Sequence, residues 1–288
     1  MIDFLKYRPV CAIISTFIFI AFFVGLYFKK FKYSVDFTGG TQVLFAFSQP
    51  IKSSQVIDIL EKNGLQGVVT RDFSEKEILV RVPSFESDAK GLADRMKNIL
   101  EQALPDISIE VMQTDSVGAG VGSTLRWKSL QAIIVGLILM LLYMWWRFWS
   151  FAYAVGNVFS LFHDAIVILA FFLFFDYEIS LNVIGAILTI LGYSINDTIV
   201  IFSRIRENAQ KLRTTAIEEV VNISINETLR RTLLTSFATL LVVVALLLFG
   251  GEILRTLALA LLVGIIFGTY SSIYIASPVM LLLYKEKH

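Results

Sequence analysis

The amino-acid sequence predicts an α-helical polytopic membrane protein with six transmembrane helices plus one small α+β (ferredoxin-like βαββαβ) extracytoplasmic domain. Of its 288 residues, 56% are hydrophobic and 17% are charged, whereas an ordinary soluble domain has about 25% charged residues. The apolar residues collect in separate blocks, each close to the roughly 20 residues that a helix needs to cross a bilayer. One long segment between the first two blocks has the composition and patterning of a soluble domain.

Six apolar blocks are the predicted transmembrane segments. They cover residues 10–28, 129–146, 151–175, 180–203, 232–249 and 256–283. The chain therefore divides into an N-terminal segment with the first span (1–30), a soluble domain (31–128) and a five-helix membrane bundle (129–288). The N-terminal residues run directly into the first block and lack a small-residue cleavage site, so we expect a retained anchor rather than a cleaved signal.

Basic residues near the ends of the spans predict the orientation of the chain, because lysine and arginine are concentrated on the cytoplasmic side. The residues on the predicted cytoplasmic side are Lys6, Arg8, Arg147, the loop 204–231, Lys285 and Lys287. We therefore expect both termini in the cytoplasm and residues 31–128 outside. Lys29, Lys30 and Lys32 oppose this orientation, but they precede a long segment, and long segments translocate largely regardless of charge.

The soluble segment is predicted to contain four strands and two helices. The strands are residues 41–48, 67–73, 77–83 and 107–114, and the helices are residues 53–64 and 87–104. Ser53 is a helix N-cap and Gly64 a helix end. The resulting order βαββαβ is the split-βαβ, ferredoxin-like arrangement.

Residues 204–231 form the main predicted cytoplasmic loop. Apolar residues at positions 217, 220, 221, 225 and 229 follow a helical period. We expect an amphipathic helix here, lying on the membrane, against a partner, or packed under the bundle.

The composition disfavours several classes of function. A formal net charge of +1 gives no reason to expect a nucleic-acid partner. The single cysteine, Cys11, and two histidines allow neither an intrachain disulfide nor a Cys/His metal site. The sequence contains no nucleophile elbow and no Walker-type phosphate loop. We therefore predict that the protein is not an enzyme and has no catalytic residue, metal or cofactor.

Two acidic residues are predicted to lie inside spans: Asp164, next to His163, and Asp197, next to Asn196. Acids inside a membrane are costly and commonly mark proton or ion pathways. The third and fourth spans are joined by a tight turn, so we expect these side chains to share one polar seam. Arg204, seven residues after Asp197, lies on the same helix face. The pattern favours a proton relay, with sodium as an alternative ion and helix–helix polar contacts as an alternative role.

Two glycine-containing strings, SVDFTGGTQV (34–43) and DSVGAGVGSTL (115–125), flank the soluble domain. Their residues of interest are Asp36, Phe37, Thr38, Gly39, Gly40, Gly118, Gly120 and Gly122. Gly39 and Gly40 allow a sharp turn with positive φ, and Asp36 can close an Asx-type turn. The second string lacks lysine and precedes a span, so a phosphate-binding loop is rejected. We predict that both strings are flexible hinges.

The chain resembles the SecD/SecF family of protein-export membrane proteins, which is related to the resistance-nodulation-division transporters. The resemblance is carried by VDFTGGT after the first span, HD in the third, GYSINDTIVIFSRIREN ending the fourth and LRRTLLTS leading into the fifth. The short segment between the first two spans is similar to that of SecF, the smaller member of the family.

The resemblance implies a fold, partners and site residues. SecF-like proteins pair with SecD in a twelve-span unit of the cytoplasmic (inner) membrane, associate with the SecYEG translocon and move a translocating preprotein outward using the proton-motive force. The family's intramembrane acids map onto Asp164 and Asp197, and its positive partner onto Arg204. Two alternatives are a subunit of a small-molecule or lipid exporter, and a passive translocon scaffold.

Overall fold

The computed structural model describes residues 1–72, 74–83 and 88–284, with the side chains of residues 119, 252 and 253 left out. It divides into two compact units: a helical bundle (Met1–Lys32 and Leu130–His288) and a sheet domain (Tyr33–Ser129). Four residues with sequence-based predictions lie outside the described residues. They are Phe73, at the end of a predicted strand, Ser87, at the start of a predicted helix, and the C-terminal Lys285 and Lys287.

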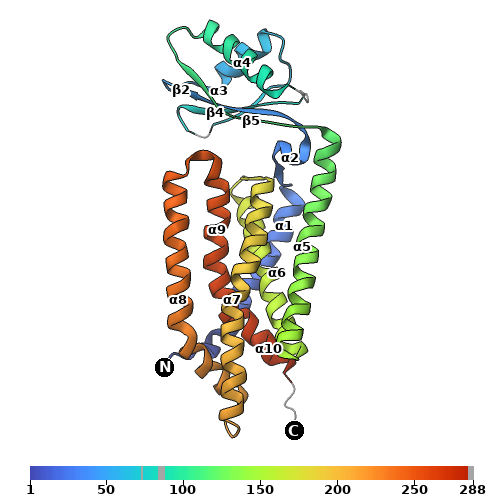
Figure 1. Cartoon of the computed structure of the whole chain (residues 1–288), viewed down its shortest axis with the longest axis vertical. Coiled ribbons are helices and arrows are strands. Elements are labelled where there is room, and N and C mark those ends of the chain that lie inside the picture. The colour runs from blue at the N-terminus through green and yellow to red at the C-terminus, as the bar shows by residue number, and fades with distance from the viewer. Residues whose placement is uncertain (73, 84–87, 285–288) are drawn as a thin grey trace. The chain divides into compact units, whose positions relative to one another are not determined.

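The bundle is built from long helices (Figure 1). Its elements are η1 (Leu5–Tyr7), α1 (Arg8–Phe28), α5 (Ala119–Phe148), α6 (Phe151–Phe174), α7 (Leu181–Lys211), α8 (Ile217–Phe249), α9 (Gly251–Ser271), the π-helix η2 (Ser272–Ala276), α10 (Ser277–Leu283) and the short strand β6 (Glu178–Ile179). Among the described residues, six helical segments are long and apolar enough to cross a membrane, with α9, η2 and α10 forming one of them.

The helices of the bundle differ in how much of their surface is buried. The most apolar window of α6 is 67% buried and that of α7 is 50% buried, against 11% for α5 and 17% for both α1 and α8. α9 packs against α6, α7 and α8, and α6 packs against α7 and α1. Several polar side chains of α6 and α7, among them Asp164, Ser194 and Asp197, are therefore enclosed by neighbouring helices, whereas α5 and α8 present apolar faces outward.

The predicted loop 204–231 is largely helical, which corrects the sequence-based boundaries. α7 continues to Lys211 and α8 begins at Ile217, so 212–216 is the connection. The amphipathic period was predicted correctly, because Val220, Val221 and Ile225 are buried where α8 packs against α7. Arg204 of α7 pairs with Glu227 of α8, and Glu207 pairs with Arg204 and Lys211 within α7.

The sheet domain has a four-stranded antiparallel sheet packed against two helices, and is preceded by the short elements β1 (Lys32–Tyr33) and α2 (Val35–Thr38). The sheet and its helices are β2 (Gly40–Phe47), α3 (Ser53–Lys62), β3 (Val69–Asp72), β4 (Glu77–Val82), α4 (Ala89–Ala103) and β5 (Ile109–Val117). The strand order is β3-β4-β2-β5, and each neighbouring pair is antiparallel. This is the ferredoxin-like βαββαβ arrangement, so the predicted fold class is confirmed.

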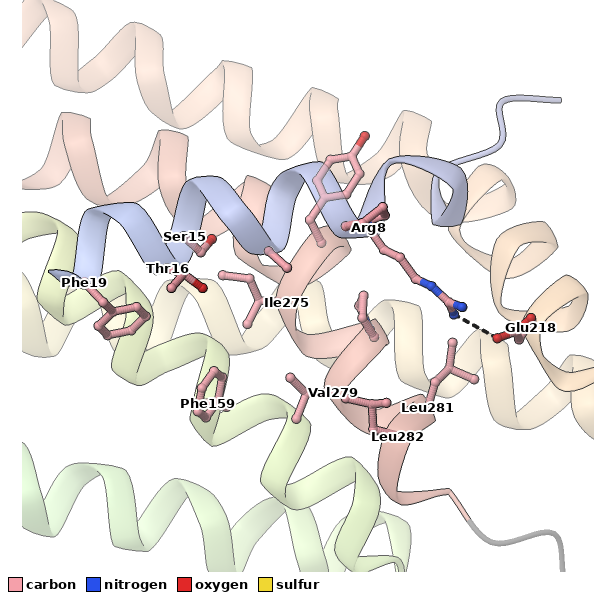
Figure 2. A pocket seen from close by; sticks show the side chains of 14 residues that line it. Arg8, Ser15, Thr16, Phe19, Phe159, Glu218, Ile275, Val279, Leu281 and Leu282 are labelled. Atoms are coloured by element: carbon pink, nitrogen blue, oxygen red, sulfur yellow. Dashed lines mark hydrogen bonds and ion pairs between the residues drawn. The ribbon is translucent and has the colours of Figure 1, made fainter. Parts of the chain in front are cut away.

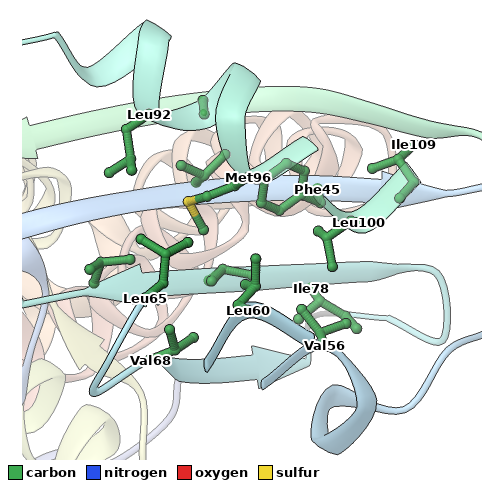
Figure 3. Close-up of a cluster of buried hydrophobic side chains, with 14 of the residues drawn as sticks. Phe45, Val56, Leu60, Leu65, Val68, Ile78, Leu92, Met96, Leu100 and Ile109 are labelled. Carbon is green, nitrogen blue, oxygen red and sulfur yellow. The ribbon is translucent and has the colours of Figure 1, made fainter. Parts of the chain in front are cut away.

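The core of the sheet domain lies between the sheet and its two helices. Figure 3 shows Leu60 of α3 and Met96 and Leu100 of α4 beside Phe45 of β2 and Ile78 of β4; all five side chains are fully buried. Burying a side chain of this size stabilises a fold by about 1.5–3 kcal/mol. Alternate residues of β2 and β4 supply the apolar face, as the period of a strand requires.

Candidate functional site

Asp164 lies near the middle of α6 and is completely buried. Ser194 of α7 donates a hydrogen bond from Oγ to Asp164 Oδ2 over 2.7 Å, and His163 Nδ1 lies 3.4 Å from Asp164 Oδ1. Gly268 of α9 makes this enclosure possible, because a Cβ there would lie 3.3 Å from Ser194 and 3.6 Å from Asp164 Oδ2. Three helices therefore close around one carboxyl group.

His163 extends this cluster toward α1. Its ring lies 5.7 Å from the ring of Phe19 and 6.0 Å from that of Tyr270, and Nε2 has no hydrogen-bond partner among the described residues. Tyr270 donates its hydroxyl hydrogen to the carbonyl oxygen of Cys11 over 2.9 Å. The imidazole is thus held by aromatic contacts while one ring nitrogen remains available for a proton or a water molecule.

Asp197 lies on the side of α7 that faces α8, and its exposed fraction is 4%. The groups of α8 that interact with it are Ser236 and Arg231. Its Oδ2 atom has no hydrogen-bond partner among the described residues, and the same holds for the buried Oγ1 of Thr232. A buried carboxylate oxygen without a partner is costly, so this position calls for a proton, a water molecule or a partner from outside the chain.

Arg231 rather than Arg204 is the basic residue that interacts with Asp197. Arg204 instead binds Glu227 through Nε at 2.6 Å and Glu207 through Nη1 at 2.7 Å. The sequence analysis missed Arg231, although the signal was present in the LRRTLLTS string that leads into the apolar part of α8.

Asn196 does not join the predicted polar seam. It is exposed and lines a groove of about 470 Å³ between α7 and α8, together with Arg204, Glu227 and Arg231. Successive residues of an α-helix point about 100° apart, so Asn196 and Asp197 cannot face the same neighbour. Ser194, one turn before Asp197, takes the place in the seam that was predicted for Asn196.

The first glycine-containing string forms a tight turn. Gly39 and Gly40 have φ of 77° and 112°, the positive values that were predicted. Ser34 caps α2 by accepting a hydrogen bond from the backbone N–H of Asp36, and Thr38 donates its hydroxyl hydrogen to the carbonyl of Ser34. A Cβ at Gly40 would lie 2.7 Å from the carbonyl oxygen of Val82, so the close approach of β4 requires glycine.

The second string contains the end of β5 and, after Gly118, the start of α5. The N–H groups of Val121 and Gly122 bond to the carbonyl of Gly118, so the first turn of α5 already includes Gly120. A Cβ at Gly122 would lie 3.1 Å from the backbone of Phe37. The two strings therefore pack against each other, and their action as hinges stays a prediction.

The described residues contain no group of three or more His, Cys, Asp or Glu side chains that could hold a metal ion. The chemistry that the site residues offer is instead proton binding at two carboxyls and one imidazole, beside one guanidinium.

Comparison with known proteins finds relatives along nearly the whole chain. The family model described as "Protein export membrane protein SecD/SecF, C-terminal" matches residues 95–286, and "SecD/SecF GG Motif" matches residues 24–51. A protein translocase subunit SecF from Thermodesulfovibrio yellowstonii is 39% identical over 260 residues, which cover 89% of this chain and 85% of that protein. The protein translocase subunit SecF from Vibrio alginolyticus is 38% identical over 288 residues, which cover 99% of this chain and 91% of that protein.

Solved structures give the same relationship. A Thermus SecDF, described as a translocon-associated membrane protein, aligns with a TM-score of 0.86 and 35% identity. SecDF in a form described as super-membrane-facing aligns with a TM-score of 0.70 and 36% identity. In both cases the match covers 98% of this chain but only 38% of the SecDF chain. The protein is a membrane protein and belongs to the SecD/SecF family of protein-export membrane proteins.

Proposed function

We propose that this chain is a SecF-like subunit of the Sec translocase accessory complex. It pairs with a SecD half and uses the proton-motive force to assist translocation and release of preproteins at the SecYEG channel. The observation that carries the proposal is the pair of buried carboxyls on neighbouring helices, Asp164 and Asp197. The curated relatives bear the name of a translocase subunit, and this chain matches 38% of a SecDF chain.

The proposed orientation places both termini in the cytoplasm and the sheet domain outside the cytoplasmic membrane. It is supported by the basic residues near the predicted cytoplasmic ends of the spans, among them Lys6, Arg8 and Arg147, because such residues favour the cytoplasmic side. The sheet domain follows α1 directly in the chain and precedes α5. Any displacement of either helix is therefore passed to that domain through the backbone.

In the proposed cycle, Asp197 changes charge as protons pass. As a carboxylate it attracts Arg231 and holds α8 to α7; when protonated, it loses that attraction and the two helices can separate. Asp164 accepts the bond from Ser194 and stores a second proton near His163. One charge that moves through 100 mV supplies about 2.3 kcal/mol, which is enough to shift a two-state equilibrium by more than tenfold.

The test is release of a preprotein from membrane vesicles under an imposed proton gradient. Asp164→Asn and Asp197→Asn are compared with Asp176→Asn, which makes the same chemical change in the exposed turn between α6 and α7. Co-purification with SecD and SecYEG is measured for every variant. We expect the complexes to form in each case and gradient-driven release to be lost only in the two buried variants.

A passive scaffold is the second candidate, favoured by the Ser194–Asp164 hydrogen bond, because a purely structural contact between helices has the same form. If both buried variants release preprotein at the wild-type rate, the carboxyls are structural and the motor proposal fails. An exporter would instead assemble without SecD, which the co-purification experiment detects.

A further inference from the structure

A groove separate from the two carboxyls runs along the surface of the bundle between α1, α6 and α10. Its volume is about 520 Å³, within the roughly 300–1,000 Å³ of small-molecule sites. Figure 2 shows Phe19 at one end and the Arg8–Glu218 pair at the other, with Phe159, Val279 and Leu282 among the side chains drawn. Most of the lining residues are apolar, and Ser15 on its wall has its hydroxyl in contact with that of Tyr270.

The length of the groove matches one leaflet of a bilayer. From Arg8 to Phe19 the helix α1 rises by about 16 Å at 1.5 Å per residue. Half of a hydrocarbon core of roughly 30 Å is about 15 Å. An occupant that fills the groove therefore has an apolar part as long as one leaflet and a polar end beside Arg8. A transmembrane helix of a partner protein would extend across both leaflets, so the groove fits a lipid better.

The polar end of the groove offers one charge of each sign. Arg8 Nη1 and Glu218 Oε1 lie 2.8 Å apart, and their side chains are 48% and 60% exposed. This contact uses one of the five N–H donors of the guanidinium and one carboxylate oxygen. Arginine binds phosphate oxygens in a two-pronged geometry, and a carboxylate binds a primary ammonium. The pair is complementary to a headgroup that carries both a phosphate and an ammonium group.

A purely anionic lipid fits this end less well. The neighbouring depression is lined by Lys6 and Arg8, but also by Asp3, Glu218 and Glu219, so the acidic side chains outnumber the basic ones among these five. Repulsion from these carboxylates disfavours a headgroup with only negative charge.

We propose that this groove is a binding site for one phosphatidylethanolamine molecule. Its phosphate binds Arg8, its ammonium binds Glu218, and one acyl chain lies along the groove as far as Phe19. The site is independent of the proton relay proposed above. Its occupant packs against α1, the helix whose C-terminal end leads into the sheet domain, and against α10.

The test uses native mass spectrometry of the full chain in mild detergent, with phosphatidylethanolamine, phosphatidylglycerol and cardiolipin added at equal concentrations. Wild type is expected to retain one phosphatidylethanolamine in preference to the other two lipids. Arg8→Gln and Glu218→Gln are each expected to weaken its binding by about tenfold, the effect of losing one charge-assisted hydrogen bond.

A second pair of variants tests the location. Ala12 lines the groove and is exposed, so Ala12→Trp fills the groove without entering the core and is expected to abolish retention. Ala132, exposed on α5, provides the matched control Ala132→Trp, which is expected to bind like wild type. Size-exclusion profiles and circular dichroism establish that each variant is folded.

Three results would overturn the proposal. Equal retention of phosphatidylglycerol or cardiolipin would refute the assigned headgroup. Undiminished retention by Ala12→Trp would refute the location. Absence of any retained lipid in wild type would refute a lipid as occupant. Retention that is lost in Ala12→Trp and kept in Ala132→Trp supports the site.

Discussion

Asp164 and Asp197 carry the same functional group on neighbouring helices, yet their surroundings differ in two respects. Asp164 is fully enclosed, with Ser194 and His163 as its polar side-chain partners among the described residues. Asp197 interacts with a cation, Arg231, and one of its oxygens has no hydrogen-bond partner among the described residues.

The two carboxyls also differ in their access to water. Arg231, which interacts with Asp197, lines the open groove between α7 and α8. Around Asp164, the close approach of α9 at Gly268 leaves no room even for a methyl group without displacement of Ser194. A group that exchanges protons needs a route to water, so we propose that Asp197 exchanges protons and that Asp164 stores a proton or stabilises the bundle.

The largest expected effect follows from replacing the cation beside Asp197. Arg231→Gln removes the charge that favours the ionised carboxylate, so we expect the carboxyl to stay protonated and gradient-driven release to fall to the level measured without a gradient. The matched variant Arg204→Gln breaks two partly exposed ion pairs, with Glu227 and with Glu207, each worth about 0.2–1 kcal/mol. It is expected to keep most of its release activity. Equal loss of release in both variants would remove the distinction between the two arginines.

A smaller effect is expected from lengthening each carboxyl by one methylene. Asp164→Glu must push against Ser194 and the backbone at Gly268, and overpacking of this kind typically costs about 1–3 kcal/mol. Asp197 Oδ2 has no hydrogen-bond partner among the described residues, so the longer side chain of Asp197→Glu displaces none there. We expect this variant to lose much less stability than Asp164→Glu. Thermal unfolding of both variants in the same detergent measures the difference. Equal destabilisation at the two sites would show that they are packed alike.

The fold class was predictable because hydropathy and element order are local properties of the sequence. The apolar blocks indicate the spans, and the βαββαβ order indicates the sheet domain, whose strand pairing then follows from known topology. The burial of Asp164 and Asp197 was predictable for the same reason, since each is surrounded by apolar residues in a long helix.

The details of the site depend on the register between helices, which no local pattern encodes. The charge of Arg231 acts on Asp197 because α8 extends 15 residues before the predicted fifth span and packs along α7. That extension is stabilised by pairs that join residues far apart in sequence, such as Asn208 with Ser224 over 3.0 Å. An amphipathic helix within 204–231 was predicted, but the extension of α7 and the continuity of that helix with the fifth span were not, because contacts between the two helices cannot be recognised from sequence.

The smallest predicted effect lies at the opposite end of the bundle, in the turn between α6 and α7. Lys29 and Lys32, which opposed the predicted orientation, bind Asp176 through Nζ at 2.8 and 3.1 Å. Asp176 has a φ of +60°, a conformation that asparagine also tolerates, so Asp176→Asn removes the charge without adding backbone strain.

The hydrogen bond from Lys29, followed by that from Lys32, lowers the pKa of Asp176 below its ordinary value of 3.8. Because the pKa is lowered in the folded state, the ion pairs stabilise the protein above pH 3.8 and lose their effect as the pH falls through the lowered value. Asp176→Asn should therefore lower the unfolding temperature by a small amount that is constant between about pH 5 and 8. The two proteins should converge only in more acidic solution. A difference in unfolding temperature that changes between pH 8 and pH 5 would instead show that a group other than Asp176 titrates at this turn. Asp176 could then no longer serve as the exposed carboxyl with which Asp164 and Asp197 are compared.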